Sequence, residues 1–176
     1  SQWPVLYWLM RIGDSILEVG CGSGKTAVLA KMLCPRKRVV AVDLGEGAVA
    51  HTRMLAAHAG VDMEVRRADT LALPYRDHEF GIAFSVGMVE HYPDEWILRA
   101  LTEQCRVAEA VLVSVPLPFY LWTHASHGDE RALAKTVWLD LFGSVAGIAD
   151  VTLLGPPTEE YQLQVILDSR VRHRQI

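Results

Sequence analysis

The chain has 176 residues, 51% of them hydrophobic and 22% charged, with a formal net charge of −4. This length suits one domain with one sizeable core, so we expect residues 1–176 to form a single domain. The negative charge argues against a nucleic-acid-binding protein, which generally presents a basic face. No apolar run reaches the roughly 18 residues of a membrane-spanning helix, and residues 1–12 lack the basic start and cleavage site of a signal peptide.

Strand-like and helical patterns alternate along the first half of the chain, which is typical of βαβ units and a mostly parallel sheet. In chain order, the elements expected here are a strand at 15–19, a helix after the glycine loop 20–24, a strand at 38–42 ending at Asp43, a helix at 46–59 with Gly60 as its stop, and strands at 63–67 and 80–86. The helical spacing predicts that the first of these helices buries Val28, Leu29, Met32 and Leu33.

The second half continues the pattern with less regularity. The elements expected here are a helix opened by Pro93, a strand at 110–115, a loop at 117–128, a helix at 129–142 and strands at 150–154 and 161–168. The helix after Pro93 should bury Ile97, Leu98, Leu101 and Cys105. Only six residues, 155–160, join the last two strands, which permits an antiparallel pair and is too short for a parallel crossover.

Three glycines at alternate positions, Gly20, Gly22 and Gly24, directly follow the first predicted strand. Such a loop lets the backbone approach a ligand, and the N–H groups of the following helix favour a negative group. A P-loop is excluded, because Val19 stands where that motif needs a glycine. A dinucleotide loop stays open as an alternative, although Lys25 occupies its third glycine position and no tyrosine has a lysine four residues later.

The segment from Glu18 to Gly24 resembles the Asp/Glu-x-Gly-x-Gly-x-Gly signature of class I S-adenosylmethionine-dependent methyltransferases. This resemblance implies S-adenosylmethionine as the cofactor, with its carboxylate against the loop N–H groups and its ammonium near Glu18. The residues expected to bind the cofactor are Glu18, Gly20, Cys21, Gly22, Gly24, Asp43, Leu44, Asp69, Thr70 and Ser85.

Two acidic residues after later strands strengthen this interpretation. Asp43 ends the second predicted strand, where a carboxylate can accept hydrogen bonds from both ribose hydroxyls. Asp69 follows the third strand, where the family places an acidic residue against the adenine amino group, and the N–H of Thr70 assists. The alternative for both carboxylates is ordinary turn or capping chemistry. Their order, each at the carboxyl end of a strand, favours the ligand-binding interpretation.

The resemblance extends from about Ser15 to Asp168 and implies a Rossmann-like three-layer α/β sandwich. Its expected sheet has seven mostly parallel strands in the order 3-2-1-4-5-7-6, with the last strand antiparallel. The stretch 80–91 resembles the fourth-strand region of the family, so the backbone near Ser85 to Met88 should line the pocket beside the methyl group. Residues 1–13 would then form a partial N-terminal lid.

Methyl transfer from a sulfonium is an in-line displacement, in which alignment and exclusion of water provide most of the acceleration. A general base is needed only if the acceptor carries a proton. His91 is the candidate base, because it follows the fourth strand and a histidine titrates near neutrality. The alternative is a histidine that only caps or packs.

A metal site is not expected. Glu90 and His91 resemble the second half of the Glu-x-x-Glu-His metal site of ubiquinone-pathway O-methyltransferases and small-RNA 2′-O-methyltransferases, but Gly87 stands where the first glutamate belongs. His124 or His127 could add a ligand, yet a site that lacks one carboxylate suits magnesium poorly. The cysteines, Cys21, Cys34 and Cys105, form no Cys-x-x-Cys pair, which argues against zinc and fits a reducing, cytoplasmic setting.

Aromatic residues in the segment 119–124 either stack on a planar acceptor or seal the end of the sheet. Trp3, Tyr7 and Trp8 present the same choice. The sequence predicts transfer of a methyl group to an O, N or C atom of a small molecule, without a nucleic-acid or membrane partner. Two alternatives remain at this point: an NAD(P)-dependent oxidoreductase and a non-catalytic methyltransferase-fold binding partner. Neither the acceptor nor the oligomeric state follows from the sequence.

Overall fold

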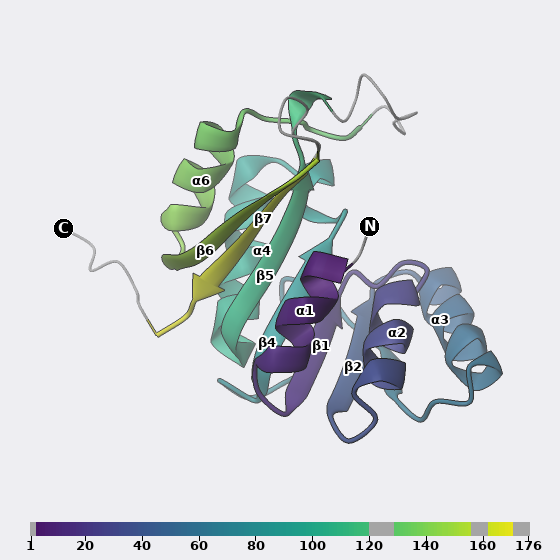
Figure 1. The fold of residues 1–176 in the computed structure, drawn as a ribbon. Coiled ribbons are helices and arrows are strands. Elements are labelled where there is room, and N and C mark those ends of the chain that lie inside the picture. Colours follow the sequence, from purple (N-terminus) through teal and green to yellow (C-terminus); the bar gives the residue numbers. More distant parts are fainter. Residues whose placement is uncertain (1–2, 120–128, 156–161, 171–176) are drawn as a thin grey trace.

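The computed structural model describes residues 3–119, 129–155 and 162–170 and shows one sheet between two layers of helices (Figure 1). The strands are β1 (Ser15–Val19), β2 (Arg38–Asp43), β3 (Glu64–Arg67), β4 (Phe80–Val86), β5 (Ala108–Pro116), β6 (Gly147–Leu154) and β7 (Gln162–Asp168). They pair in the order β3-β2-β1-β4-β5-β7-β6. The first five are mutually parallel, and β7 is antiparallel to both of its neighbours. The predicted fold class and strand order are confirmed.

The helices divide between the two faces of the sheet. They are α1 (Trp3–Arg11), α2 (Lys25–Leu33), α3 (Glu46–His58), the short 3-10 helix η1 (Val89–His91), α4 (Asp94–Val107) and α6 (Lys135–Gly143). Helices α1, α2 and α3 cover one face, while α4 and α6 cover the other (Figure 1). No helix in the described part of the chain has the length and apolar character needed to cross a membrane.

Alternating side chains of the central strands supply the two halves of the core. In β1, Ile16 joins the cluster under α1 to α3, whereas Leu17 and Val19 join the cluster under α4 and α6. This alternation follows from the two-residue period of a strand that is covered on both faces. Glu18 lies one residue from Leu17 and therefore on the α2 side of the sheet.

Helix α2 differs from its predicted packing. Val28 is buried, and Leu29 is half-buried, but Met32 is 53% exposed and Leu33 is 41% exposed. The face turned to the sheet carries small residues instead, Ala27 and Ala30. Small side chains allow close helix–sheet packing, and the prediction from helical spacing is confirmed for Val28 but wrong for Met32 and Leu33.

The predicted helix at 129–142 is too long, because α6 begins only at Lys135. The preceding segment, 129–134, forms neither helix nor strand and lies against η1 and α4, where Arg131 N donates to Glu90 O. Elsewhere the predicted boundaries move by a few residues: β5 and β6 begin earlier than expected, β3 begins at Glu64, and the helix after Pro93 begins at Asp94. Leu98 is half-buried, whereas the three other residues predicted for the inner face of α4 are buried.

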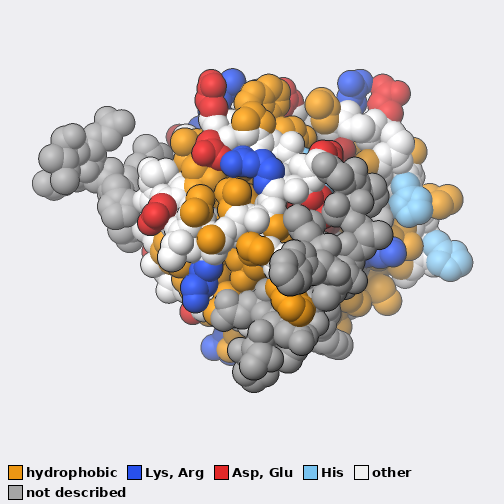
Figure 2. Space-filling model, turned by 90° about the horizontal axis from the view of Figure 1, so that it is seen from above, with side chains coloured by type: hydrophobic (Ala, Val, Ile, Leu, Met, Phe, Trp, Pro, Cys, Tyr) orange, Lys and Arg blue, Asp and Glu red, His pale blue; other side chains and the backbone are white. Residues whose placement is uncertain are grey.

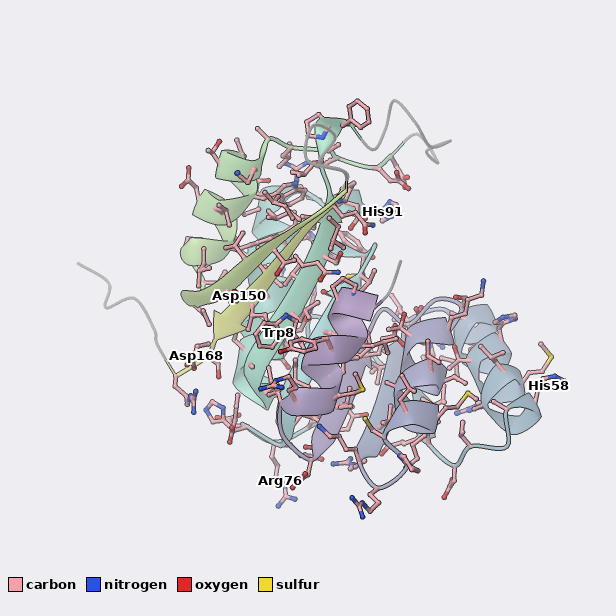
Figure 3. The ribbon with its side chains drawn as sticks, viewed as in Figure 1. Trp8, His58, Arg76, His91, Asp150 and Asp168 are labelled. Carbon is pink, nitrogen blue, oxygen red and sulfur yellow. The ribbon has the colours of Figure 1, made fainter. Side chains whose placement is uncertain are left out.

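Helix α1 packs on the sheet rather than over a ligand site. Val5, Leu6 and Leu9 are buried in the core under α1 to α3. Trp8 lines a surface hollow with Gly81 and other residues near the amino ends of β4 and β5, and Figure 3 shows it well away from His91. Trp8 therefore lies apart from the carboxyl ends of the strands, and the partial lid predicted for residues 1–13 stays a prediction.

Candidate functional site

A cleft of about 270 Å³ opens at the carboxyl ends of β1, β2, β3 and β4. Its lining residues are Val19, Gly20, Gly22, Val42, Asp43, Leu44, Ala68, Asp69, Thr70, Gly87, Met88, His91, Tyr92 and Trp96. This is the edge at which open α/β sheets bind ligands. Figure 2 is viewed from above this end of the molecule and shows hydrophobic, acidic and basic side chains interspersed among the coloured residues.

The glycine loop is held by the neighbouring strand. Gly20 N and Cys21 N both donate to Val42 O, at 2.9 and 3.0 Å. Gly20, Gly22 and Gly24 have φ values of +72°, +50° and +68°, which other residues adopt only with strain. The alternate glycines are thus required by the backbone path of the loop.

The three glycines face different surroundings. A Cβ added at Gly24 would overlap the side chain of Thr52, and one added at Gly20 would overlap the side chain of Met88. A Cβ at Gly22 would meet no atom within 4 Å. Two glycines therefore permit close packing inside the protein, while Gly22 leaves open the space on the side of the cleft.

Asp43 joins the end of β2 to the glycine loop. Its Oδ2 accepts a hydrogen bond from Gly22 N at 2.9 Å, and its Oδ1 accepts one from Gly45 N at 2.9 Å. A carboxylate oxygen can accept more than one hydrogen bond, so both oxygens retain capacity for the hydroxyls of a ligand. The predicted ribose-binding carboxylate lies in the cleft and is held in place by backbone N–H groups.

At the β3 end of the cleft, the predicted residues Asp69 and Thr70 lie together. Asp69 Oδ1 accepts from Leu71 N at 2.9 Å, which turns the chain back after the strand. Thr70 Oγ1 is buried and has no hydrogen-bond partner among the described residues. Leu44, 58% exposed, adds apolar surface from the β2 side. The wall therefore offers both polar and apolar groups.

Four of the predicted cofactor residues are not part of the cleft lining: Glu18, Cys21, Gly24 and Ser85. Glu18 is 4% exposed, and its Oε2 accepts from Ala27 N at 3.1 Å in the first turn of α2. Burial, together with the nearby charge of Asp43, raises the pKa of the Glu18 carboxyl to about 8. Glu18 therefore stabilises the start of α2, and its contact with the ammonium group of the cofactor stays a prediction.

The other three residues are also structural in this arrangement. Cys21 Sγ lies 3.4 Å from Thr52 Oγ1, and burial raises the pKa of its thiol to about 11. Gly24 packs against Thr52 as described. Ser85 is 1% exposed and lies inside β4, so that the backbone of Gly87 and Met88 lines the cleft in its place.

The β4 side of the cleft is formed by η1 and the first turn of α4. His91 lines the cleft, and its Nδ1 lies 3.1 Å from Asp129 Oδ1. Tyr92 and Trp96 stack with ring centroids 5.7 Å apart and an interplanar angle of 6°, and Trp96 is 42% exposed. This side thus combines a carboxylate-paired imidazole with an exposed aromatic face.

Glu90 is the second buried acid beside the cleft. It is 4% exposed, and its Oε2 has no hydrogen-bond partner in the described part of the chain. Burial, together with the nearby charge of Glu130, raises the pKa of its carboxyl to about 7. Among the described residues, no group of three or more His, Cys, Asp or Glu side chains could hold a metal ion; His124 and His127 lie outside them, as does most of the aromatic segment 119–124.

Sequence reasoning missed three residues on the β4 side of this site, Tyr92, Trp96 and Asp129, whereas Met88 lies in the stretch 85–88 that was predicted to line the pocket. An available signal was the spacing of Tyr92 and Trp96, which places two aromatic rings on one side of a helix start at the ligand-binding edge. Asp129 had no comparable signal, because its contact with His91 depends on how a distant segment folds back.

The chain resembles known methyltransferases in sequence and in fold. The family described as "Methyltransferase domain" matches residues 16–110. The 27-O-demethylrifamycin SV methyltransferase of Amycolatopsis mediterranei is 31% identical over 141 residues, which cover 74% of this chain and 51% of the relative. The ubiquinone biosynthesis O-methyltransferase of Azotobacter vinelandii is 32% identical over 84 residues, covering 47% of this chain and 35% of the relative.

Among solved structures, magnesium protoporphyrin IX methyltransferase from Synechocystis PCC 6803 with bound SAH superposes with a TM-score of 0.76. The match has 16% identity and covers 97% of this chain and 81% of that chain. The present chain spans about half the length of the rifamycin relative. Of the two ligands left open for the glycine loop, a dinucleotide and S-adenosylmethionine, these similarities favour S-adenosylmethionine, which is the cofactor of the family. The chain belongs to the class I S-adenosylmethionine-dependent methyltransferases.

Proposed function

We propose that residues 1–176 form a single domain that transfers a methyl group from S-adenosylmethionine to a small-molecule acceptor, with the cofactor bound in the cleft at the carboxyl ends of β1 to β4. The observation that carries the proposal is the joint position of the glycine loop, Asp43 and Asp69 on one cleft. The names of the relatives favour a small molecule, because they refer to rifamycin and ubiquinone chemistry. The net charge of −4 gives no support to a nucleic-acid substrate.

The residues present fit the cofactor. Asp43 offers two carboxylate oxygens for the ribose hydroxyls, and Thr70, whose N–H is the predicted contact, lines the same cleft. Leu44 and Trp96 present exposed apolar surface to the same cleft, as an adenine ring requires. The open space beside Gly22 suits the amino-acid end, which needs close approach to backbone. Glu18 supports this binding set from below, because its carboxylate accepts from Ala27 N and holds the start of α2 beside the glycine loop.

The bound cofactor would supply a methyl group on a positively charged sulfur. The protein then has to hold the acceptor in line with that methyl group and exclude water. We include His91 as the group that accepts the acceptor's proton, because it lines the cleft on the β4 side. A reducing, cytoplasmic location stays part of the proposal, because Cys21, Cys34 and Cys105 are not joined in a disulfide.

Calorimetric titration with S-adenosylhomocysteine tests the proposal, with NADH and ATP as controls. We expect binding of S-adenosylhomocysteine alone. Asp43→Ala should weaken it roughly 10- to 100-fold, since hydrogen bonds to a charged group contribute about 1.5–3 kcal/mol each. Asp62→Ala is a matched control, because Asp62 is exposed and lies outside the cleft.

Because Asp43 also holds the glycine loop, thermal unfolding of Asp43→Ala must be measured beside its affinity. A folded variant without affinity supports the binding role of the carboxylate. Tight NADH binding by the wild-type protein without S-adenosylhomocysteine binding would overturn the proposal.

A further inference from the structure

The imidazole of His91 and the carboxylate of Asp129 meet at the edge of the cleft. His91 Nδ1 lies 3.1 Å from Asp129 Oδ1, and the exposed fractions of the two side chains are 29% and 66%. The two residues come from separate elements, since His91 ends η1 and Asp129 begins the segment 129–134. Figure 3 shows His91 at the upper end of the sheet, which is the end where the cleft opens.

The segment 129–134 is attached to this side of the cleft by one arginine. Arg131 N donates to Glu90 O at 3.0 Å. The guanidinium donates to Tyr92 O at 2.7 Å and to Asp94 Oδ1 at 2.6 Å. These three bonds connect the segment to η1 and to the first turn of α4, so Asp129 is carried to His91 by a fixed backbone.

An aspartate on Nδ1 determines which nitrogen carries the proton in the neutral ring. An ionised carboxylate only accepts hydrogen bonds, so it stabilises the tautomer with hydrogen on Nδ1. The lone pair then lies on Nε2, on the side of the ring away from Asp129. Because His91 lines the cleft, Nε2 is the nitrogen available to a molecule bound there.

We propose that Asp129 is a positioning residue that holds His91 with its Nε2 as a proton acceptor, and that the methyl acceptor is therefore a hydroxyl group. This inference rests on the proposed function and deepens it. A carboxylate acceptor is already ionised, and a neutral amine already has a free lone pair. A hydroxyl is a weak nucleophile until it loses its proton, so it benefits most from an oriented base.

The transfer balances without a further reactant. The hydroxyl proton passes to His91 Nε2 while an oxygen lone pair forms the new O–CH3 bond. The bond between the methyl carbon and sulfur breaks, and its electron pair remains on sulfur to give S-adenosylhomocysteine. The imidazolium that results is stabilised by the negative charge of Asp129.

Nitrogen NMR of the histidine rings tests the arrangement directly. At about pH 8.5 an ordinary histidine is neutral, and the spectra distinguish hydrogen on Nδ1 from hydrogen on Nε2. With S-adenosylhomocysteine present, we expect His91 of the wild-type protein to carry hydrogen mainly on Nδ1. Asp129→Ala should shift it mainly to Nε2, the usual form of a free side chain, whereas Asp94→Asn should leave it unchanged.

Calorimetry on the same samples separates this inference from the proposed function. If the wild-type protein fails to bind S-adenosylhomocysteine, the proposed function falls, whatever the tautomer. If binding is intact and Asp129→Ala leaves the His91 tautomer unaltered, the positioning role is wrong. We expect all three proteins to bind S-adenosylhomocysteine within about twofold, because Asp129 and Asp94 lie outside the cleft lining.

A labelled-methyl assay tests the acceptor class. The probes are phenol, catechol and cyclohexanol, each beside its methyl ether, together with a tertiary amine. We expect label only in hydroxyl compounds, and an Asp129→Ala kcat lower by about 10-fold or more with KM nearly constant. Label in the ethers or the amine, or in no probe, would overturn the hydroxyl assignment.

Discussion

On the β1–β2 side of the cleft, the chain is held by bonds between neighbours in the sheet. On the β4 side, it is held by a segment from much later in the sequence. Gly20 N and Cys21 N bond to Val42 O on the first side. Arg131 bonds to Glu90 O and Tyr92 O on the second. The first side is therefore set by the strand order, and the second depends on tertiary packing.

The two sides also differ in what their buried acids do. Glu18 accepts a hydrogen bond from Ala27 N and has a structural partner. Glu90 leaves Oε2 without a partner in the described part of the chain. A buried carboxyl without a partner is costly when ionised. The β4 side thus carries more unsatisfied polar chemistry, which is typical of functional surfaces.

The largest effect on the β1–β2 side should come from Gly24→Ala. Its Cβ would overlap Thr52 at a φ of +68°. We expect the free energy of unfolding to fall by about 3–5 kcal/mol, the sum of overpacking and left-handed strain. Chemical denaturation measures the loss.

Gly22→Ala is the matched control, because it has a similar φ of +50° but open space around its Cβ. Gly22→Ala should lower the free energy of unfolding by only about 1–2 kcal/mol. Its affinity for S-adenosylhomocysteine should nevertheless fall further than the affinity of those Gly24→Ala molecules that fold. Equal losses of stability in the two variants would contradict the packing argument.

The sequence predicts most of the β1–β2 side and little of the β4 side. Alternate glycines and the acids after β2 and β3 are local signals, and Asp43, Asp69 and Thr70 lie in the cleft as predicted. The strand order, implied by resemblance, is confirmed. Their roles in binding the cofactor stay predictions.

What the sequence could not supply depends on side-chain direction and on distant contacts. Glu18 has the expected position in the chain, but its direction follows from which face of β1 it occupies. The position of the segment 129–134 depends on the bonds of Arg131 to Tyr92 O and Asp94, which no periodicity encodes.

A pH-dependent effect should follow from Glu18→Gln. The folded protein raises the pKa of this carboxyl from 4.5 to about 8, so the folded state binds the proton more tightly than the unfolded state. The contribution of the protonated Glu18 carboxyl to the free energy of unfolding is therefore complete below about pH 4.5 and is lost as the pH rises towards 8. Glutamine keeps an acceptor for Ala27 N without a charge, so the variant should gain about 2–3 kcal/mol over wild type between pH 5 and pH 8.

Glu90→Gln provides the comparison on the β4 side. The pKa of Glu90 is raised only to about 7. The gain in free energy of unfolding of Glu90→Gln over wild type should therefore be smaller than that of Glu18→Gln and should be complete nearer pH 7. Urea unfolding of both variants at several pH values measures the difference. A Glu18→Gln variant that parallels wild type at every pH would show that its carboxyl does not resist ionisation.

A smaller loss of stability should follow from Arg131→Ala. The variant loses two side-chain bonds at a half-exposed site, which we expect to cost about 1 kcal/mol. Hydrogen exchange at the Arg131 amide should accelerate more than exchange in β4, because the segment 129–134 would detach locally. Unchanged protection of that amide would mean that the backbone bond to Glu90 O holds the segment without the guanidinium.

The smallest effect concerns the aromatic face of the β4 side. Trp96→Ala removes one ring of the Tyr92–Trp96 stack and exposed apolar surface from the cleft. A stacking contact contributes about 0.5–1.5 kcal/mol, so the affinity for S-adenosylhomocysteine should fall roughly 2- to 10-fold. Trp8→Ala is the matched control, because Trp8 lines the separate hollow near the amino ends of β4 and β5. Quenching of tryptophan fluorescence by S-adenosylhomocysteine should persist in Trp8→Ala and largely disappear in Trp96→Ala; the reverse pattern would place the ligand away from the β4 side.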